Sequence, residues 1–192
     1  PRLQAQLLMD LGALTVASGD NAKALTTYQQ AMTLVEAQGD IGQLVQLQSR
    51  MATLYRDLGQ TDRALASYQQ AIRIAEQRGD QLSQGTLLGD LGEVYWTIGQ
   101  CGEALATYQQ AVSFARIARN DRYIIKLLMA IGRVNDTEGH FDDALDAYQE
   151  ALQMTRQIGD AALEAEVLTN QGDAFRSAGQ FDNALKAYQQ AL

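Results

Sequence analysis

Apolar residues along this chain recur with the spacing of amphipathic helices. Between residues 88 and 98 they stand three or four positions apart, and Gly99 follows. A second run with the same spacing extends from residue 104 toward residue 118. Because glycine tolerates the backbone conformations of tight turns, the pattern predicts two antiparallel helices joined at Gly99, with Leu88, Leu91 and Val94 facing the core.

This pattern returns every 40 residues along the whole chain. Each return carries a tyrosine in a YQQA or YQEA tetrapeptide, together with a turn glycine and a small alanine. Self-similarity at such a period is typical of a solenoid, in which each unit buries its apolar face against its neighbours. The repeated positions are Gly19, Gly59, Gly99, Gly139 and Gly179; Ala24, Ala64, Ala104, Ala144 and Ala184; and Tyr28, Tyr68, Tyr108, Tyr148 and Tyr188.

The repeats divide the chain into five units of one solenoid over residues 1–192. Their bounds are 5–44, 45–84, 85–124, 125–164 and 165–192. The last unit is truncated and the first lacks a polar capping helix, so we expect a fragment of a longer protein. We also expect apolar side chains at the ends to favour weak self-association. At the C-terminal end these are Ala184, Ala187, Ala191 and Leu192.

The ends of the helices follow general rules of helix capping. Gly39, Gly79 and Gly159 are expected to close second helices in the left-handed conformation. The third unit has Arg119 and Asn120 there, and because asparagine tolerates that conformation we expect only a slightly altered connection. The helix dipole explains acids in the first turns of second helices better than catalysis does. These acids are Asp62, Glu103, Asp142 and Asp182.

Together these residues resemble the tetratricopeptide repeat family, in the variant with a lengthened second helix. The Leu-Gly signature of the first helix appears as Leu11-Gly12, Leu91-Gly92 and Ile131-Gly132, and is loosened to Met51-Ala52 and Gln171-Gly172. The resemblance covers essentially the whole chain. It implies an all-α fold, a right-handed superhelical solenoid of antiparallel helix pairs, whose first helices line a concave groove.

Composition narrows the classes of function. The chain is 46% hydrophobic and 20% charged, and its single proline stands at position 1. A net charge of -8 opposes binding to nucleic acid and to anionic membranes. One cysteine excludes an internal disulfide, and neither a signal peptide nor a membrane span is visible. A cytoplasmic location is therefore expected.

Residues suited to catalysis or to cofactor binding are scarce. Cys101 and His140 are the only residues of their kinds. Cys101 occupies the position of Phe141 and Phe181 in other repeats, which predicts a partly buried packing residue, and His140 is expected to be an exposed turn residue. The alternative, a metal site formed by this histidine and nearby acids, has little support. No enzyme activity, cofactor or metal is expected.

The candidate binding surface lies on the outward positions of the first helices. Their chemistry changes at every repeat, as a recognition surface should, and the alternative is that they are merely solvated. The sequence therefore predicts a scaffold that binds a protein or peptide segment in the groove. A structural module that self-associates or spaces other domains is the second hypothesis. The candidate residues are Arg56, Glu93, Trp96, Arg133, Asp136, Asp173 and Arg176.

Trp96 is the residue of this surface that the repeat pattern does not explain. A large aromatic in an outward position predicts an apolar anchor for an extended partner segment. The arginines suggest acidic groups in that segment, although Arg133 with Asp136 and Arg176 with Asp173 can pair along their own helices. Arg56 has only Thr53 at the corresponding position of its helix and is the better cation. Alternatively, Trp96 packs against the neighbouring first helix.

Overall fold

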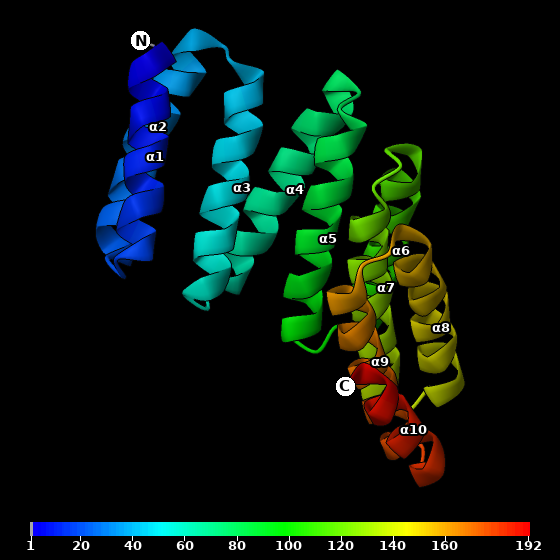
Figure 1. The fold of residues 1–192 in the computed structure, drawn as a ribbon. Coiled ribbons are helices and arrows are strands. Elements are labelled where there is room, and N and C mark those ends of the chain that lie inside the picture. The colour runs from blue at the N-terminus through cyan, green and yellow to red at the C-terminus, as the bar shows by residue number, and fades with distance from the viewer. Residues whose placement is uncertain (1) are drawn as a thin grey trace. The chain divides into compact units, whose positions relative to one another are not determined.

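The computed structural model describes residues 2–192, and these residues form ten α-helices and no strand (Figure 1). The predicted all-α fold is confirmed. The first helices of the pairs are α1 (Arg2–Ala17), α3 (Ile41–Asp57), α5 (Gln81–Thr97), α7 (Asp121–Thr137) and α9 (Ala161–Ser177). The second helices are α2 (Asn21–Gln38), α4 (Thr61–Arg78), α6 (Cys101–Ile117), α8 (Phe141–Ile158) and α10 (Phe181–Ala191).

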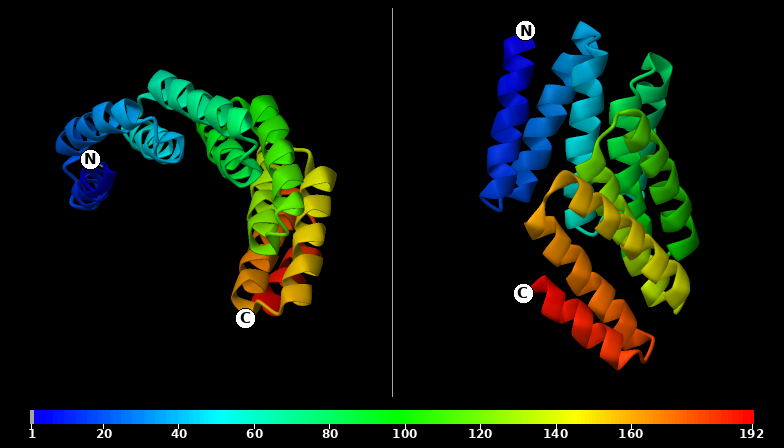
Figure 2. Two further views of the ribbon diagram at one scale, coloured as in Figure 1. Left: turned by 90° about the horizontal axis from the view of Figure 1, so that it is seen from above. Right: turned by 45° about the vertical axis from the view of Figure 1, so that its right-hand side comes forward.

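The chain divides into two compact units, and the boundary falls inside α5, between Val94 and Tyr95. In the N-terminal unit α1 packs on α2, α3 packs on α4, and α3 also contacts both α1 and α2. In the C-terminal unit α7 packs between α6 and α8, and α9 between α8 and α10 (Figure 2, green to red). First helices also contact each other directly, α1 with α3 and α7 with α9.

The repeated alanines, and the repeated tyrosines of the first four pairs, are buried in the core. Ala24, Ala64, Ala104 and Ala144 are completely buried, as the sequence predicts. The tyrosine rings lie against the small residue of the Leu-Gly signature. A Cβ atom added to Gly12 would lie 2.3 Å from the ring of Tyr28, and one added to Gly132 or Gly172 would lie 2.6 Å from Tyr148 or Tyr188. The glycines therefore make room for the aromatic rings, and the close packing holds the helices together.

The turns confirm the predicted glycine caps with one exception. Gly39, Gly79 and Gly159 have φ values of 65°, 66° and 69°. In the third pair the left-handed residue is Arg119, with φ of 53°, and the expectation for Asn120 was wrong. Asn120 instead caps α7, because its side chain accepts a hydrogen bond from the backbone N–H of Tyr123 at 3.2 Å. Capping satisfies a backbone donor that the start of a helix otherwise leaves without a partner.

The C-terminal helix corrects another expectation. Ala184 and Ala187 are only 4% and 5% exposed, because α10 turns them toward α9. The exposed apolar side chains of this helix are Phe181 and Leu185, together with Leu192 just beyond its last residue. The expected first-turn acids are present at Asp62, Glu103, Asp142 and Asp182. In the part of the chain that the structure describes, no helix is long and apolar enough to cross a membrane.

Enlarging one buried alanine should destabilise the fold. Ala104 is completely buried in α6, so Ala104→Leu forces a larger side chain into a filled space. We expect a loss of about 1 to 3 kcal/mol in the free energy of unfolding, measured by thermal denaturation. Ala106→Leu, at an exposed position of the same helix, is the matched control and should leave the melting temperature nearly unchanged.

Replacing Arg119, which has a left-handed backbone conformation, with glycine should stabilise the fold. A side chain in this conformation costs roughly 1 to 2 kcal/mol, so Arg119→Gly should raise stability by about 1 kcal/mol after the greater freedom of glycine in the unfolded chain is counted. The reciprocal variant Gly159→Arg, at the equivalent turn, should lower stability. Chemical denaturation measures the free energy of unfolding of both variants. Changes of the same sign and size in the two variants would refute the explanation that the left-handed backbone at residue 119 is strained.

Candidate partner-binding surface

The candidate residues lie on the first helices, and we call the outward surface of these helices in each unit its first-helix face. In the N-terminal unit this face belongs to α1, α3 and α5 up to Val94, and it carries Arg56 and Glu93. In the C-terminal unit it belongs to the end of α5 and to α7 and α9. The five candidates there are Trp96, Arg133, Asp136, Asp173 and Arg176.

Trp96 lies under an arginine of the next first helix. The guanidinium carbon of Arg133 on α7 is 4.8 Å from the centre of the Trp96 ring, which is the geometry of a cation–π contact. Trp96 is half-buried and Arg133 is exposed. This contact with the neighbouring helix is of the kind that the packing alternative predicted. The two side chains therefore present one composite surface, with the charged group outermost.

The acidic candidates of the C-terminal unit are held by neighbours on α9 and α10. Asp173 accepts a hydrogen bond of 2.8 Å from the Tyr188 hydroxyl. It also forms an ion pair of 3.0 Å with Arg176 on the next helical turn, which confirms the expected pairing along the helix. The Ser177 hydroxyl donates to Oδ2 of Asp136 at 3.4 Å. Oδ1 of Asp136 is buried and finds no hydrogen-bond donor among residues 2–192. Arg176 thus has its charge largely balanced already.

The buried tyrosines connect the core to this face. Burial raises the pKa of Tyr148, and the carboxylates of Asp136 and Asp173 raise it further while Arg133 opposes them. In the N-terminal unit the hydroxyl of Tyr68 shares a hydrogen bond of 2.9 Å with Thr53 on α3. The residues that fill the helix pairs therefore bring their polar ends to the first-helix face.

Arg56 differs from the sequence expectation. Its Nε and Nη2 atoms both donate to Oδ1 of Asp57 at 3.0 Å, so the guanidinium is paired within its own helix. The expectation overlooked this partner because consecutive residues do not face each other on a helix. The arginine side chain is long enough to turn back to the last residue of α3.

Asp90 is the residue of this face that the sequence expectations missed. It is half-buried on α5, and burial raises its pKa to about 6, with Arg56 opposing the rise and Glu93 adding to it. Burial and the nearby Asp90 also raise the pKa of Tyr68 to about 12. One signal was visible in the sequence, since Asp10, Arg50 and Asp90 occupy equivalent positions three residues before the predicted outward column.

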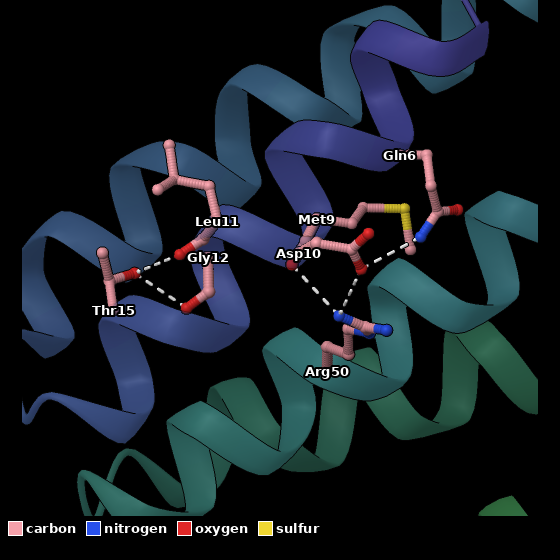
Figure 3. A network of polar contacts seen from close by, with 7 residues as sticks. All are labelled: Gln6, Met9, Asp10, Leu11, Gly12, Thr15 and Arg50. Atoms are coloured by element: carbon pink, nitrogen blue, oxygen red, sulfur yellow. Dashed lines mark hydrogen bonds and ion pairs between the residues drawn. The ribbon is translucent and has the colours of Figure 1, made fainter.

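Asp10 and Arg50, which occupy the same repeated position as Asp90, join α1 to α3 (Figure 3). Arg50 donates to the backbone oxygen of Met9 at 3.0 Å and lies 3.8 Å from the Asp10 carboxylate. The Gln6 amide donates to the same carboxylate at 3.1 Å. Arg50 is therefore occupied in holding two first helices together.

A cleft of about 400 Å³ opens between α3 and α5 in the N-terminal unit. Val45 and Leu87 are buried at its floor, and Leu82, which is 61% exposed, forms part of its wall. Its polar lining includes Ser49, Arg50, Ser83 and Thr86. Such a combination of apolar floor and polar rim is typical of sites that receive a side chain of a partner.

Cys101 and His140 lie where the sequence predicts them. Cys101 is half-buried, as predicted, and burial together with the Glu138 carboxylate raises the pKa of its thiol, which disfavours the reactive thiolate. His140 is exposed at the start of α8, also as predicted. In residues 2–192, no three His, Cys, Asp or Glu side chains are grouped to hold a metal ion.

The antiparallel helix pairs and the variable first-helix face define a repeat scaffold of the kind that mediates interactions between proteins. The family model described as tetratricopeptide repeat matches residues 3–77, 43–117 and 122–192. The chain therefore belongs to the tetratricopeptide repeat family. No curated protein matches it significantly.

Solved structures show the same fold. BtubC (BKLC) from P. vanneervenii has a TM-score of 0.86 and 21% identity, over 97% of this chain and 77% of that one. A Podosopora anserina protein described as a kinesin light chain with nearly identical TPR-like repeats has a TM-score of 0.83 and 15% identity, over 97% and 92% of the two chains. A Pyrococcus horikoshii signal transduction ATPase with a tetratricopeptide repeat sensor has a TM-score of 0.85 and 18% identity, over 100% and 31%.

The burial of Asp90 leads to a pH-dependent prediction. Its pKa rises from an ordinary 3.8 to about 6, so its contribution to stability is fully present below about pH 4 and is lost as pH rises through 6. Asp90→Asn does not titrate. The free energy of unfolding of this variant, relative to that of the wild type, should rise by about 1 to 3 kcal/mol between about pH 4 and about pH 6. Above about pH 6 the difference between the two proteins should stay level. Thermal denaturation across this range measures it, and a constant difference would contradict the assignment.

Proposed function

We propose that the chain is a receptor for an extended segment of a partner protein, which it binds on the first-helix face. The observation that carries this proposal is the contrast between two sets of repeated positions. The buried alanines and tyrosines keep their identity in every repeat, whereas the outward positions of the first helices change from arginine to tryptophan to aspartate. Packing explains the first set, and recognition explains the second.

Membership of the family supports this proposal, since its repeats serve as scaffolds for binding proteins. The repeat region of the Pyrococcus horikoshii ATPase is described as a sensor. Fold alone does not fix function, so the proposal depends on the side chains of the face.

We place the anchor of the C-terminal unit at Trp96 and Arg133. The stacked pair offers an aromatic edge and an exposed guanidinium, and such residues are frequent in the centres of interfaces. Arg133 is also the arginine proposed to meet an acidic group of the partner.

Removing the anchor should weaken partner binding without unfolding the protein. A partner captured from a lysate and identified by mass spectrometry is titrated by calorimetry against the wild type and Trp96→Ala. We expect a loss of at least about 1 to 2 kcal/mol in binding free energy, with a nearly unchanged melting temperature. Phe181→Ala is the matched control, since this aromatic residue is 69% exposed on α10, away from the face. Equal affinities for wild type and Trp96→Ala would exclude this anchor.

Self-association is a second candidate function, favoured by the exposed apolar side chains of α1 and α10. Leu3, Leu7 and Leu14 are exposed on α1, and Phe181 and Leu185 on α10. Contacts between these surfaces of different copies are not closed by symmetry and would give weak end-to-end oligomers. Sedimentation velocity over a wide concentration range tests this. Oligomers that disappear in Leu185→Glu would support it, and a monomer at all concentrations would exclude it.

A further inference from the structure

We propose that the cleft between α3 and α5 binds an extended peptide in which one residue separates an apolar side chain from a lysine or arginine. This inference rests on the proposed receptor function and gives the partner's chemistry at one position. The apolar side chain would enter the cleft, and the basic group would meet Asp90.

The cleft provides a site for the apolar side chain. Val45 and Leu87 close its floor, and Leu82 offers an exposed apolar wall. Its open volume of about 400 Å³ accommodates a large aliphatic or aromatic side chain. Arg50 at the rim is engaged by Met9 and Asp10, so it stays beside the cleft and does not compete for the carboxylate of Asp90.

The charges next to the cleft favour a cation. The carboxylate of Asp90 lies near that of Glu93 and near the guanidinium of Arg56 on α3, which also faces Asp57. Both guanidinium hydrogen bonds of Arg56 that the structure shows go to Asp57. The negative charge of Asp90 is therefore only partly offset, and Tyr68, facing it from α4, is uncharged at neutral pH. A basic side chain of a partner would neutralise the remaining negative charge of Asp90.

The distance between the two features sets the spacing in the peptide. Thr86 at the rim of the cleft and Asp90 are four residues apart on α5, which corresponds to a rise of roughly 6 Å along the helix. In an extended segment, alternate side chains lie on one side and are about 7 Å apart. Side chains at positions i and i+2 therefore reach the cleft and Asp90 together.

The test begins with a phage library of random twelve-residue peptides, selected on the full 192-residue chain. We expect enrichment of peptides with an apolar residue and a lysine or arginine separated by one position. Enrichment of acidic peptides, of peptides without this spacing, or of none would overturn the inference.

Variants then locate the binding site of an enriched synthetic peptide, measured by fluorescence anisotropy. Asp90→Asn should weaken binding at least tenfold, and the peptide with glutamine in place of its basic residue should bind both proteins equally. Ser49→Phe, which fills the cleft, should weaken binding at least tenfold, whereas Ser113→Phe at an exposed serine of α6 should not. Melting temperatures of all variants show that each is folded.

The outcomes separate this inference from the receptor function. A peptide whose binding ignores Asp90→Asn and Ser49→Phe but fails with Trp96→Ala would refute the cleft and leave the receptor function standing. A peptide that depends on Asp90 and Ser49 supports both.

Discussion

The rings of the repeated tyrosines lie against the first helices where a Cβ atom would clash with Tyr28, Tyr148 or Tyr188. This contact sets how closely two helices of a pair approach, because the interior of a protein is packed without spare volume. The second pair has Ala52 at the glycine position, and it too is completely buried. The remaining core positions of each pair pack within the helix spacing that this contact sets.

The same tyrosines give the first-helix face part of its polarity. The hydroxyl of Tyr188 reaches Asp173, and that of Tyr68 reaches Thr53, so core residues place hydrogen-bonding groups beside the outward columns. A substitution of one of these tyrosines would therefore alter both stability and the electrostatics of the face. The tyrosines therefore belong both to the core and to the polar surface of the first helices.

Charges on the first-helix face are mostly balanced locally. Arg56 pairs with Asp57, Arg176 pairs with Asp173, and Arg133 covers Trp96. Since exposed pairs of this kind contribute little to stability, their arrangement is free to serve recognition. Asp90 is the exception, because its burial makes the charged form costly and leaves a site for an opposite charge.

The sequence by itself determined the helix pairs, the buried alanines and the glycine turns. These features are local or repeat every 40 residues, so neighbouring copies define each position. Tertiary structure decided what the outward side chains touch. Arg133 turned onto Trp96, and Asp90 became half-buried on α5 within reach of the charge of Arg56 on α3. Such contacts join side chains of different helices, and no periodic pattern along one chain specifies which rotamers meet.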